Sequence, residues 1–135
     1  MAGTVVETHV KRGRIGCITL TITGDASDGS VPDTVLATKI GGYLLALETN
    51  PGATAPTANY DITLVDADGH DVLEGVGANR HTSTTEKVSI VYSGTAVHPP
   101  VGKVDVLTVN VDNNSVASAG IVAKLYYEGD ADGAP

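Results

Sequence analysis

The chain has 135 residues, a length that fits one domain with one moderate core. Its formal net charge is −8, so its surface repels phosphate backbones and anionic lipid head groups. Neither nucleic acid nor a membrane is therefore expected as a partner. The sequence contains no Trp or Phe and five Tyr, so the core is predicted to be aliphatic.

Sixteen Gly and six Pro, together with abundant Thr and Val, favour strands joined by tight turns over helices. The predicted fold is all-β, a β-sandwich or barrel-like domain of about nine short antiparallel strands with an extended N-terminal arm. We predict an N-terminal arm or edge strand over residues 1–14, a single β domain over residues 15–128, and a flexible tail over residues 129–135.

The N-terminal residues 3–10 alternate only weakly between apolar and polar, which is typical of an edge strand or of an arm that becomes ordered on a partner. A basic cluster, Lys11, Arg12 and Arg14, follows in an otherwise acidic chain. It is either a solvated patch or a docking arm for an acidic partner surface.

Residues 14–23 predict a stronger strand, with Ile18, Leu20 and Ile22 on one face. The opposite face holds Cys17, Thr19, Thr21 and Thr23. A face lined by Thr suits either water or a subunit contact. The glycine pair Gly41 and Gly42 is predicted to end a short strand, and residues 43–47 are apolar on both faces, which predicts a central strand covered on both sides.

Residues 59–80 predict a hairpin with a strand over 60–64, a turn over 66–69 and a second strand over 71–76. Residues 93–102 contain two consecutive prolines and are predicted to form a surface loop. From residue 103 the alternation changes phase at Val106 and Leu107, which predicts a bulge or a strand that passes between two sheets. Residues 121–127 give a last alternating strand.

The acidic turn Asp66, Asp68 and Asp71 is either a plain hairpin turn or a weak surface cation site. It does not fit an EF-hand, because His70 stands at the fifth loop position and no helices flank the turn.

The remaining polar residues give no signature of catalysis or of a metal site. The histidines lack the paired spacings of zinc sites, and no nucleophile elbow is present. Cys17 is the single cysteine, which excludes an intrachain disulfide and a cysteine-based metal site. We therefore expect no enzyme activity, no catalytic residue, no cofactor and no metal. The chain opens without an apolar leader, so we expect a soluble protein that is synthesised in the cytoplasm.

The runs APTANYDITL (55–64), DADGHDVLEG (66–75) and GANR (77–80) resemble small structural proteins of tailed bacteriophages encoded among the head genes. A looser resemblance extends over most of the chain. It implies a virion protein, and for a small acidic all-β protein it implies a capsid decoration (cement) protein. Such a protein would bind the major capsid protein on the outer surface of the capsid, as a homo-oligomer, expected to be a trimer.

We predict that the contact with the capsid is made by the N-terminal segment, because an extended segment can add a strand to an exposed sheet edge. The predicted contact residues are Val5, Val6, His9, Val10, Lys11, Arg12 and Arg14. Two alternatives stay open: a component of the neck, tail or head fibre, and a carbohydrate-binding adhesion module on the virion. The second requires an exposed tyrosine platform.

Overall fold

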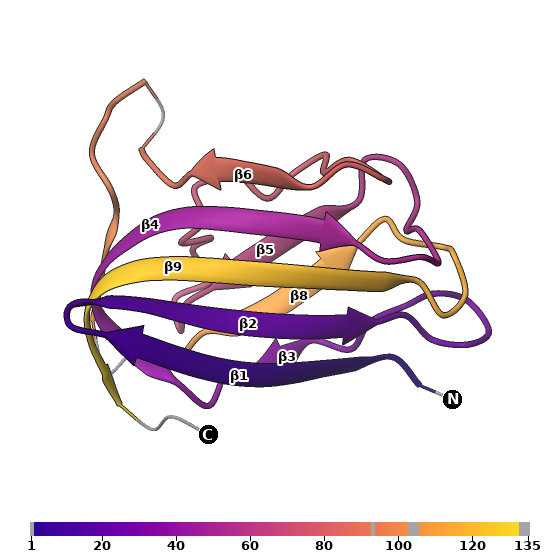
Figure 1. Ribbon diagram of the computed structural model, residues 1–135, viewed down its shortest axis with the longest axis horizontal. Coiled ribbons are helices and arrows are strands. Elements are labelled where there is room, and N and C mark those ends of the chain that lie inside the picture. The colour runs from indigo at the N-terminus through magenta and orange to yellow at the C-terminus, as the bar shows by residue number, and fades with distance from the viewer. Residues whose placement is uncertain (1, 93, 103–105, 133–135) are drawn as a thin grey trace.

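The computed structural model describes residues 2–92, 94–102 and 106–132, which form nine strands in two antiparallel sheets and no helix (Figure 1). The all-β prediction is confirmed. The large sheet has the strand order β1, β2, β9, β4, β6, with β7 paired to β4. Its strands are β1 (Thr4–Arg12), β2 (Ile15–Thr23), β9 (Gly120–Asp132), β4 (Lys39–Pro51), β6 (Glu86–Ser89) and β7 (Pro100–Val101).

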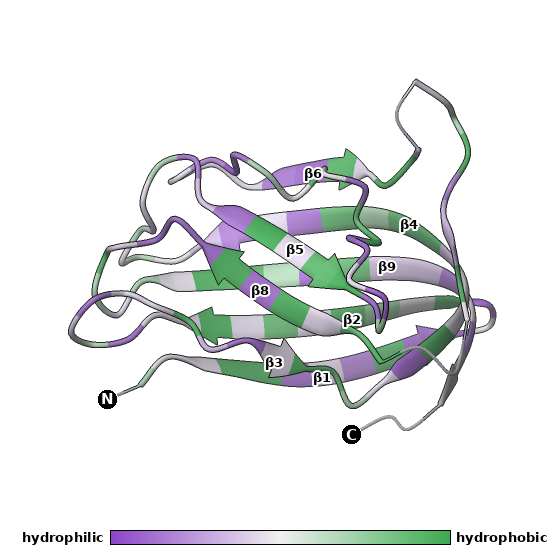
Figure 2. Ribbon diagram, turned by 180° about the vertical axis from the view of Figure 1, so that it is seen from behind, coloured by the Kyte–Doolittle hydropathy of each residue, from purple (hydrophilic) through white to green (hydrophobic). Residues whose placement is uncertain are grey.

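The small sheet crosses one face of the large sheet diagonally, and the other face of the large sheet carries no second layer of described residues (Figures 1 and 2). Its strand order is β3, β8, β5. Its strands are β3 (Thr34–Val35), β8 (Thr108–Asp112) and β5 (Asp61–Val65). Within the described part of the chain, no helix is long and apolar enough to cross a membrane.

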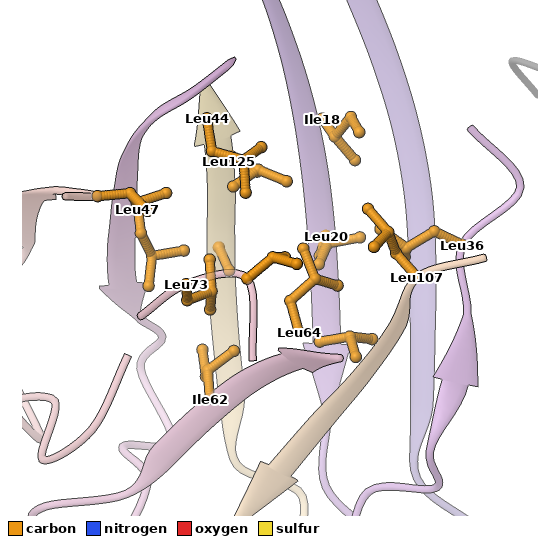
Figure 3. Close-up of a cluster of buried hydrophobic side chains, with 14 of the residues drawn as sticks. Ile18, Leu20, Leu36, Leu44, Leu47, Ile62, Leu64, Leu73, Leu107 and Leu125 are labelled. Atoms are coloured by element: carbon orange, nitrogen blue, oxygen red, sulfur yellow. The ribbon is translucent and has the colours of Figure 1, made fainter. Parts of the chain in front are cut away.

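The core lies between the two sheets and is built almost entirely from branched aliphatic side chains (Figure 3). Ile18 and Leu20 of β2 point toward the small sheet and are almost fully buried, as their alternation predicts. Leu64 of β5 and Leu107, which precedes β8, meet them from the other layer. Because each strand buries every second side chain, one face of each sheet makes the core and the other is left outside.

The first strand of the predicted hairpin is β5, but the second strand over 71–76 is wrong: these residues form successive turns. Positive φ angles at Glu74 (53°) and Gly75 (81°) bend the chain away from an extended path. The carboxylate of Asp71 accepts the backbone N–H groups of Leu73 (3.1 Å) and Gly75 (3.0 Å), which holds the turn closed. Leu73 is therefore carried into the core by a turn instead of a strand.

Two predictions about β4 also need correction. The strand continues through Gly41 and Gly42, because these glycines lie where β4 and β9 approach closely: a Cβ at Gly42 would lie 2.0 Å from the Glu128 carbonyl oxygen. Residues 43–47 are covered on one face only. Leu44 is buried but Tyr43 is 51% exposed, since the small sheet packs on a single side.

The predicted proline loop contains β7, in which Pro100 pairs with Tyr43 of β4. A proline lacks an N–H donor but keeps its carbonyl, and the Pro99 carbonyl accepts the Leu44 N–H at 3.1 Å. Val106 is exposed and Leu107 is buried, in phase with Val109 of β8 that follows. The predicted bulge or crossing strand also involves residues 103–105, which lie outside the described residues, so it stays a prediction.

The C-terminal strand β9 is longer than the alternating pattern indicates. The flexible tail was predicted to begin at residue 129, but β9 continues to Asp132 and pairs with the first residues of β4. Gly129, with φ of 142°, allows this close pairing because its missing Cβ would lie 2.0 Å from the Gly41 carbonyl oxygen. Residues 133–135 lie outside the described part.

Tyr60 brings a polar group into one end of the core. It is fully buried, and its hydroxyl has no hydrogen-bond partner among the described residues. Burial raises the pKa of Tyr60 above its ordinary value of 10.0.

This burial makes stability depend on pH in the alkaline range. Above pH 10 the unfolded chain ionises Tyr60 while the folded chain keeps the proton, so the free energy of unfolding falls as pH rises toward the folded pKa. We expect Tyr60→Phe to make this fall shallower, by up to about 1.4 kcal/mol per pH unit, and to change stability at pH 7 by less than about 1 kcal/mol. Denaturant unfolding at pH 7, 10 and 11 measures both effects. An equal alkaline slope in the two proteins would contradict the prediction.

Candidate functional site

The N-terminal segment is strand β1, which pairs with β2 without interruption from Thr4 opposite Thr23 to Arg12 opposite Ile15. Gly13, with φ of 61°, provides the first position of the two-residue turn that joins the strands. Of the two predicted alternatives, arm or edge strand, the structure contains the edge strand. The β1 segment is thus part of the folded sheet before any partner binds.

Strand alternation divides the predicted contact residues between two faces. Val5 points toward the small sheet, where it packs against the core, and His9 lies on the same face. Val6 and Val10 point outward and are 56% and 57% exposed. By register, Arg12 lies on the same outward face as the two valines, and Lys11 lies on the inward face. Arg14 lies in the turn after β1. The structure therefore does not bring the seven residues together on one surface.

Glu7, which the sequence did not single out, connects β1 to the second layer. Its carboxylate oxygens accept the backbone N–H groups of Ala37 (2.7 Å) and Thr38 (3.0 Å), in the connection between β3 and β4. Hydrogen bonds to an ionised acceptor are stronger than neutral ones. Glu7 therefore fixes β1 against the second layer of the protein. Its hydrogen-bond partners lie about 30 residues away in the sequence, so no local sequence pattern predicts the contact.

His9 and Tyr127 form a second connection between β1 and the sheet. The Nε2 atom of His9 hydrogen-bonds the Tyr127 hydroxyl, and the rings stack with centroids 5.8 Å apart at 20°. Tyr127 lies opposite Gly16 of β2, where an added Cβ would be 2.2 Å from the ring. The glycine thus leaves room for the tyrosine to lie across it. Burial raises the pKa of Tyr127, with a smaller contribution from Asp130.

The basic cluster lies at the turn between β1 and β2. The Lys11 ammonium donates to the Gly13 carbonyl oxygen and so closes on its own turn. Arg12 and Arg14 are exposed and form no salt bridge with a carboxylate among the described residues. Whether this charge is solvated or docks an acidic surface stays a prediction.

The outer face of the large sheet, which faces the viewer in Figure 1, is not covered by a second layer of described residues. Besides Val6 and Val10, Ile15 and Tyr43 are 47% and 51% exposed on it. Ile15 of β2 and Tyr43 of β4 lie on either side of Glu128 of β9, which pairs with both strands. The remaining positions on this face of β2 are Cys17 and threonines, as the alternation predicts. Ile15 was detectable in the sequence, because it is out of phase with Ile18 and in phase with Cys17.

Ionisable groups on this outer face nearly cancel, in contrast to the chain as a whole. By register, up to residue 130 of β9, the face carries Arg12, Lys39, Lys87, Lys124, Glu48, Glu128 and Asp130, which is four cations against three carboxylates in a chain of net charge −8. The excess negative charge therefore lies elsewhere on the molecule. These exposed apolar side chains within a nearly neutral surface make the outer face the candidate contact surface.

Two tyrosines of the described residues, Tyr43 and Tyr126, lie on the strands of the outer face, and a lysine side chain covers the ring of one of them. The Lys87 ammonium lies 4.3 Å from the Tyr126 ring centroid and covers it. Partial burial, followed by the nearby Glu48 carboxylate, raises the pKa of Tyr126. Tyr43 is thus the exposed aromatic ring of this face.

The acidic turn does not gather its carboxylates around a common point. The Oδ1 atom of Asp66 accepts the backbone N–H groups of Asp68 and His70, each at 3.0 Å. Asp71 binds backbone N–H groups of its own turn, as described above. No group of three or more metal-ligating side chains occurs among the described residues. The geometry is that of a hydrogen-bonded turn.

The other histidines lie apart and have local partners. The His70 Nε2 atom lies 2.5 Å from Glu74 Oε2, and this hydrogen bond raises the pKa of His70. His81 Nδ1 lies 2.9 Å from the Thr84 N–H, and His98 Nδ1 lies 2.7 Å from the Ile90 carbonyl oxygen. These contacts organise loops. The expectation that the chain is not an enzyme stays a prediction.

No protein-family model and no curated protein matches this chain. Among solved structures, a chain from one described as the cyanophage Pam1 capsid asymmetric unit is similar, with a TM-score of 0.39 and 18% sequence identity. The match covers 96% of this chain and 87% of that chain. A TM-score at this level does not establish a shared fold.

Proposed function

We propose that this protein is a non-enzymatic structural component of a phage virion: a decoration protein that binds the outer surface of the capsid. The observation that carries the proposal is the uncovered outer face of the large sheet, where exposed apolar side chains lie within a nearly neutral surface of an acidic protein. The resemblance of residues 55–80 to small head proteins of tailed phages supports the same role. Its partner would be the major capsid protein.

The structure changes which residues we assign to the contact. The outward members of the predicted set, Val6, Val10 and Arg12, remain, and Ile15 and Tyr43 join them on the outer face. Val5 and His9 leave the set because they pack inside the protein. Removal of residues 2–12 is a poor test, since it would uncover β2 and destroy the bonds of Glu7.

Capsids of the encoding phage, assembled without this protein and expanded, provide the direct test by co-sedimentation. We expect the wild-type protein to bind and the double variant Ile15→Asp/Tyr43→Asp to bind at least about tenfold more weakly, because carboxylates on a desolvated apolar contact stay unpaired. Val35→Asp is the matched control: Val35 is 61% exposed but belongs to the small sheet. Equal binding by all three proteins would remove the outer face from the contact.

The alternative positions differ in symmetry and in ligand. A reconstruction of the virion that places the protein in a ring at the neck or tail, and not on the shell, would replace decoration by a connector or tail role. A glycan that binds at Tyr43, and is lost in Tyr43→Ala, would favour the adhesion module. Failure of the wild-type protein to bind capsids would contradict the decoration role itself.

A further inference from the structure

The sheet edges of this protein are unequally protected, and β1 is the exception. Edge strand β6 has four residues and β3 has two, so both edges are short. Residues 71–80 cover the outer edge of β5: the Leu64 carbonyl accepts the Val72 N–H and the Tyr60 carbonyl accepts the Arg80 N–H, each at 2.8 Å. Strand β1 has nine residues, no proline and no bulge, and no described strand pairs with its outer edge. Such an edge is a template for another strand.

The backbone groups at this free edge follow from the pairing of β2. The Gly129 N–H donates to the Arg14 carbonyl, and the Gly24 N–H donates to the Ala119 carbonyl. Arg14 and Gly24 stand directly before and after β2 in the same register, so the even-numbered residues of β2 form the backbone hydrogen bonds with β9. Odd-numbered residues of β2 therefore bond β1, where their partners are even-numbered. The residues of β1 with N–H and C=O groups at the free edge are Val5, Glu7, His9 and Lys11.

We infer that the free edge of β1 pairs antiparallel with β1 of a second copy of this chain, across a two-fold axis at Thr8. In this register each Val6 lies opposite Val10 of the other copy, in the close pair type that makes no backbone hydrogen bonds. The free backbone groups then meet as Val5 with Lys11 and Glu7 with His9. Val6 of each copy then packs beside Val10 of the other copy on the outer face of one continuous sheet.

Neighbouring registers are less favourable. To keep outward residues facing outward, the register can shift only by an even number of residues. A shift by one such step places Val6 opposite either Thr8 or Arg12, and the valines no longer meet. The central register also places Arg12 opposite Thr4, so the two basic turns lie at opposite ends of the seam and no like charges are opposed.

The second copy is the favoured occupant because β1 is complementary to itself in both pattern and charge. A two-fold contact uses the same patch on both chains, which this palindromic arrangement of Val6, Thr8 and Val10 provides. Glu7 and His9 keep their partners inside each chain, so the contact rests on the backbone bonds and the valines. The inference does not depend on the proposed capsid role, and it replaces the expected trimer by a dimer.

Engineered cysteines test the register directly, in a Cys17→Ser background. We expect Thr8→Cys to form a disulfide-linked dimer on oxidation, because Thr8 lies opposite itself. Val6→Cys and Val10→Cys should each form no disulfide-linked dimer alone and should cross-link when mixed. Thr21→Cys is the control, since it lies on the same outer face one strand away from the seam. Cross-linking of Val6→Cys with itself, or equal cross-linking of the control, would overturn the register.

Equilibrium sedimentation tests the contact without cross-links. We expect the wild-type protein to form a dimer and Val6→Lys to weaken dimerisation by at least about tenfold, while Val35→Lys leaves it unchanged. Circular dichroism checks that each variant is folded. A wild-type monomer at all concentrations, or a trimer, would overturn the inference. Capsid binding by the Ile15→Asp/Tyr43→Asp variant is scored separately, because neither residue belongs to the seam.

Discussion

Gly16→Ala is expected to lower the free energy of unfolding by about 2–3 kcal/mol, since overpacking of a rigid site costs this much. The added Cβ would lie 2.2 Å from Cζ and 2.4 Å from the hydroxyl oxygen of Tyr127. Tyr127 is fully buried and its hydroxyl holds His9, so the ring has no free space in which to move. Relief of the clash must displace the ring or β1. Denaturant unfolding measures the loss.

Gly120→Ala is the matched control for this substitution. Gly120 begins β9, has no positive φ, and its added Cβ would meet only the Gly52 Cα, at 3.8 Å. Its effect on stability should stay within about 1 kcal/mol. We also expect Gly16→Ala, but not Gly120→Ala, to speed hydrogen exchange in β1, because the contact between His9 and Tyr127 is disturbed. If both variants are equally stable, Tyr127 does not lie across Gly16.

Glu7→Ala is expected to destabilise the protein by about 2–4 kcal/mol. The substitution leaves the N–H groups of Ala37 and Thr38 without their acceptor, and Thr38 is 1% exposed. Loss of a hydrogen bond to a charged group costs about 1.5–3 kcal/mol, and a buried unpaired donor adds to it. Glu7→Gln should fall between Ala and the wild type, because one oxygen remains as an acceptor.

Glu48→Gln is the control, since Glu48 lies on the outer face and accepts no hydrogen bond from a described residue. Its change in stability should be within about 0.5 kcal/mol. Thermal and denaturant unfolding of the four proteins give the comparison. A Glu7→Ala protein as stable as Glu48→Gln would show that the hydrogen bonds of Glu7 do not hold β1 against the second layer.

The strands that sequence patterns predicted best are those with unbroken alternation. In β2, β5 and β9 the aliphatic residues of the alternating pattern, such as Ile18, Leu64 and Leu125, are buried as predicted. The second strand of the predicted hairpin failed because Val72, Leu73 and Val76 look like a short strand although a turn delivers them to the core. Side-chain acceptors such as Asp71 decide this outcome, and their partners are not visible in the alternation.

The seven predicted contact residues divide between two faces of the sheet, because neighbours in a strand point to opposite sides. Val6, Val10 and Arg12 share the outer face, but Val5 and His9 face inward. Ile15 and Tyr43 join that face from two other strands, and Tyr43 is separated from Ile15 by 28 positions in the chain. Pairing through β9 brings them into one row, and this depends on sheet order.

The sequence by itself determined the class of fold, the inward sides of the main strands, and a Thr-lined side of β2 suited to water or a contact. These properties are local, since the two-residue period of a strand assigns each side chain to a face. Only the tertiary structure decided which sheet face the small sheet covers, and that β1 is a fixed edge with its outer side open. Strand order and layer packing join residues far apart in the chain, so no local pattern encodes them.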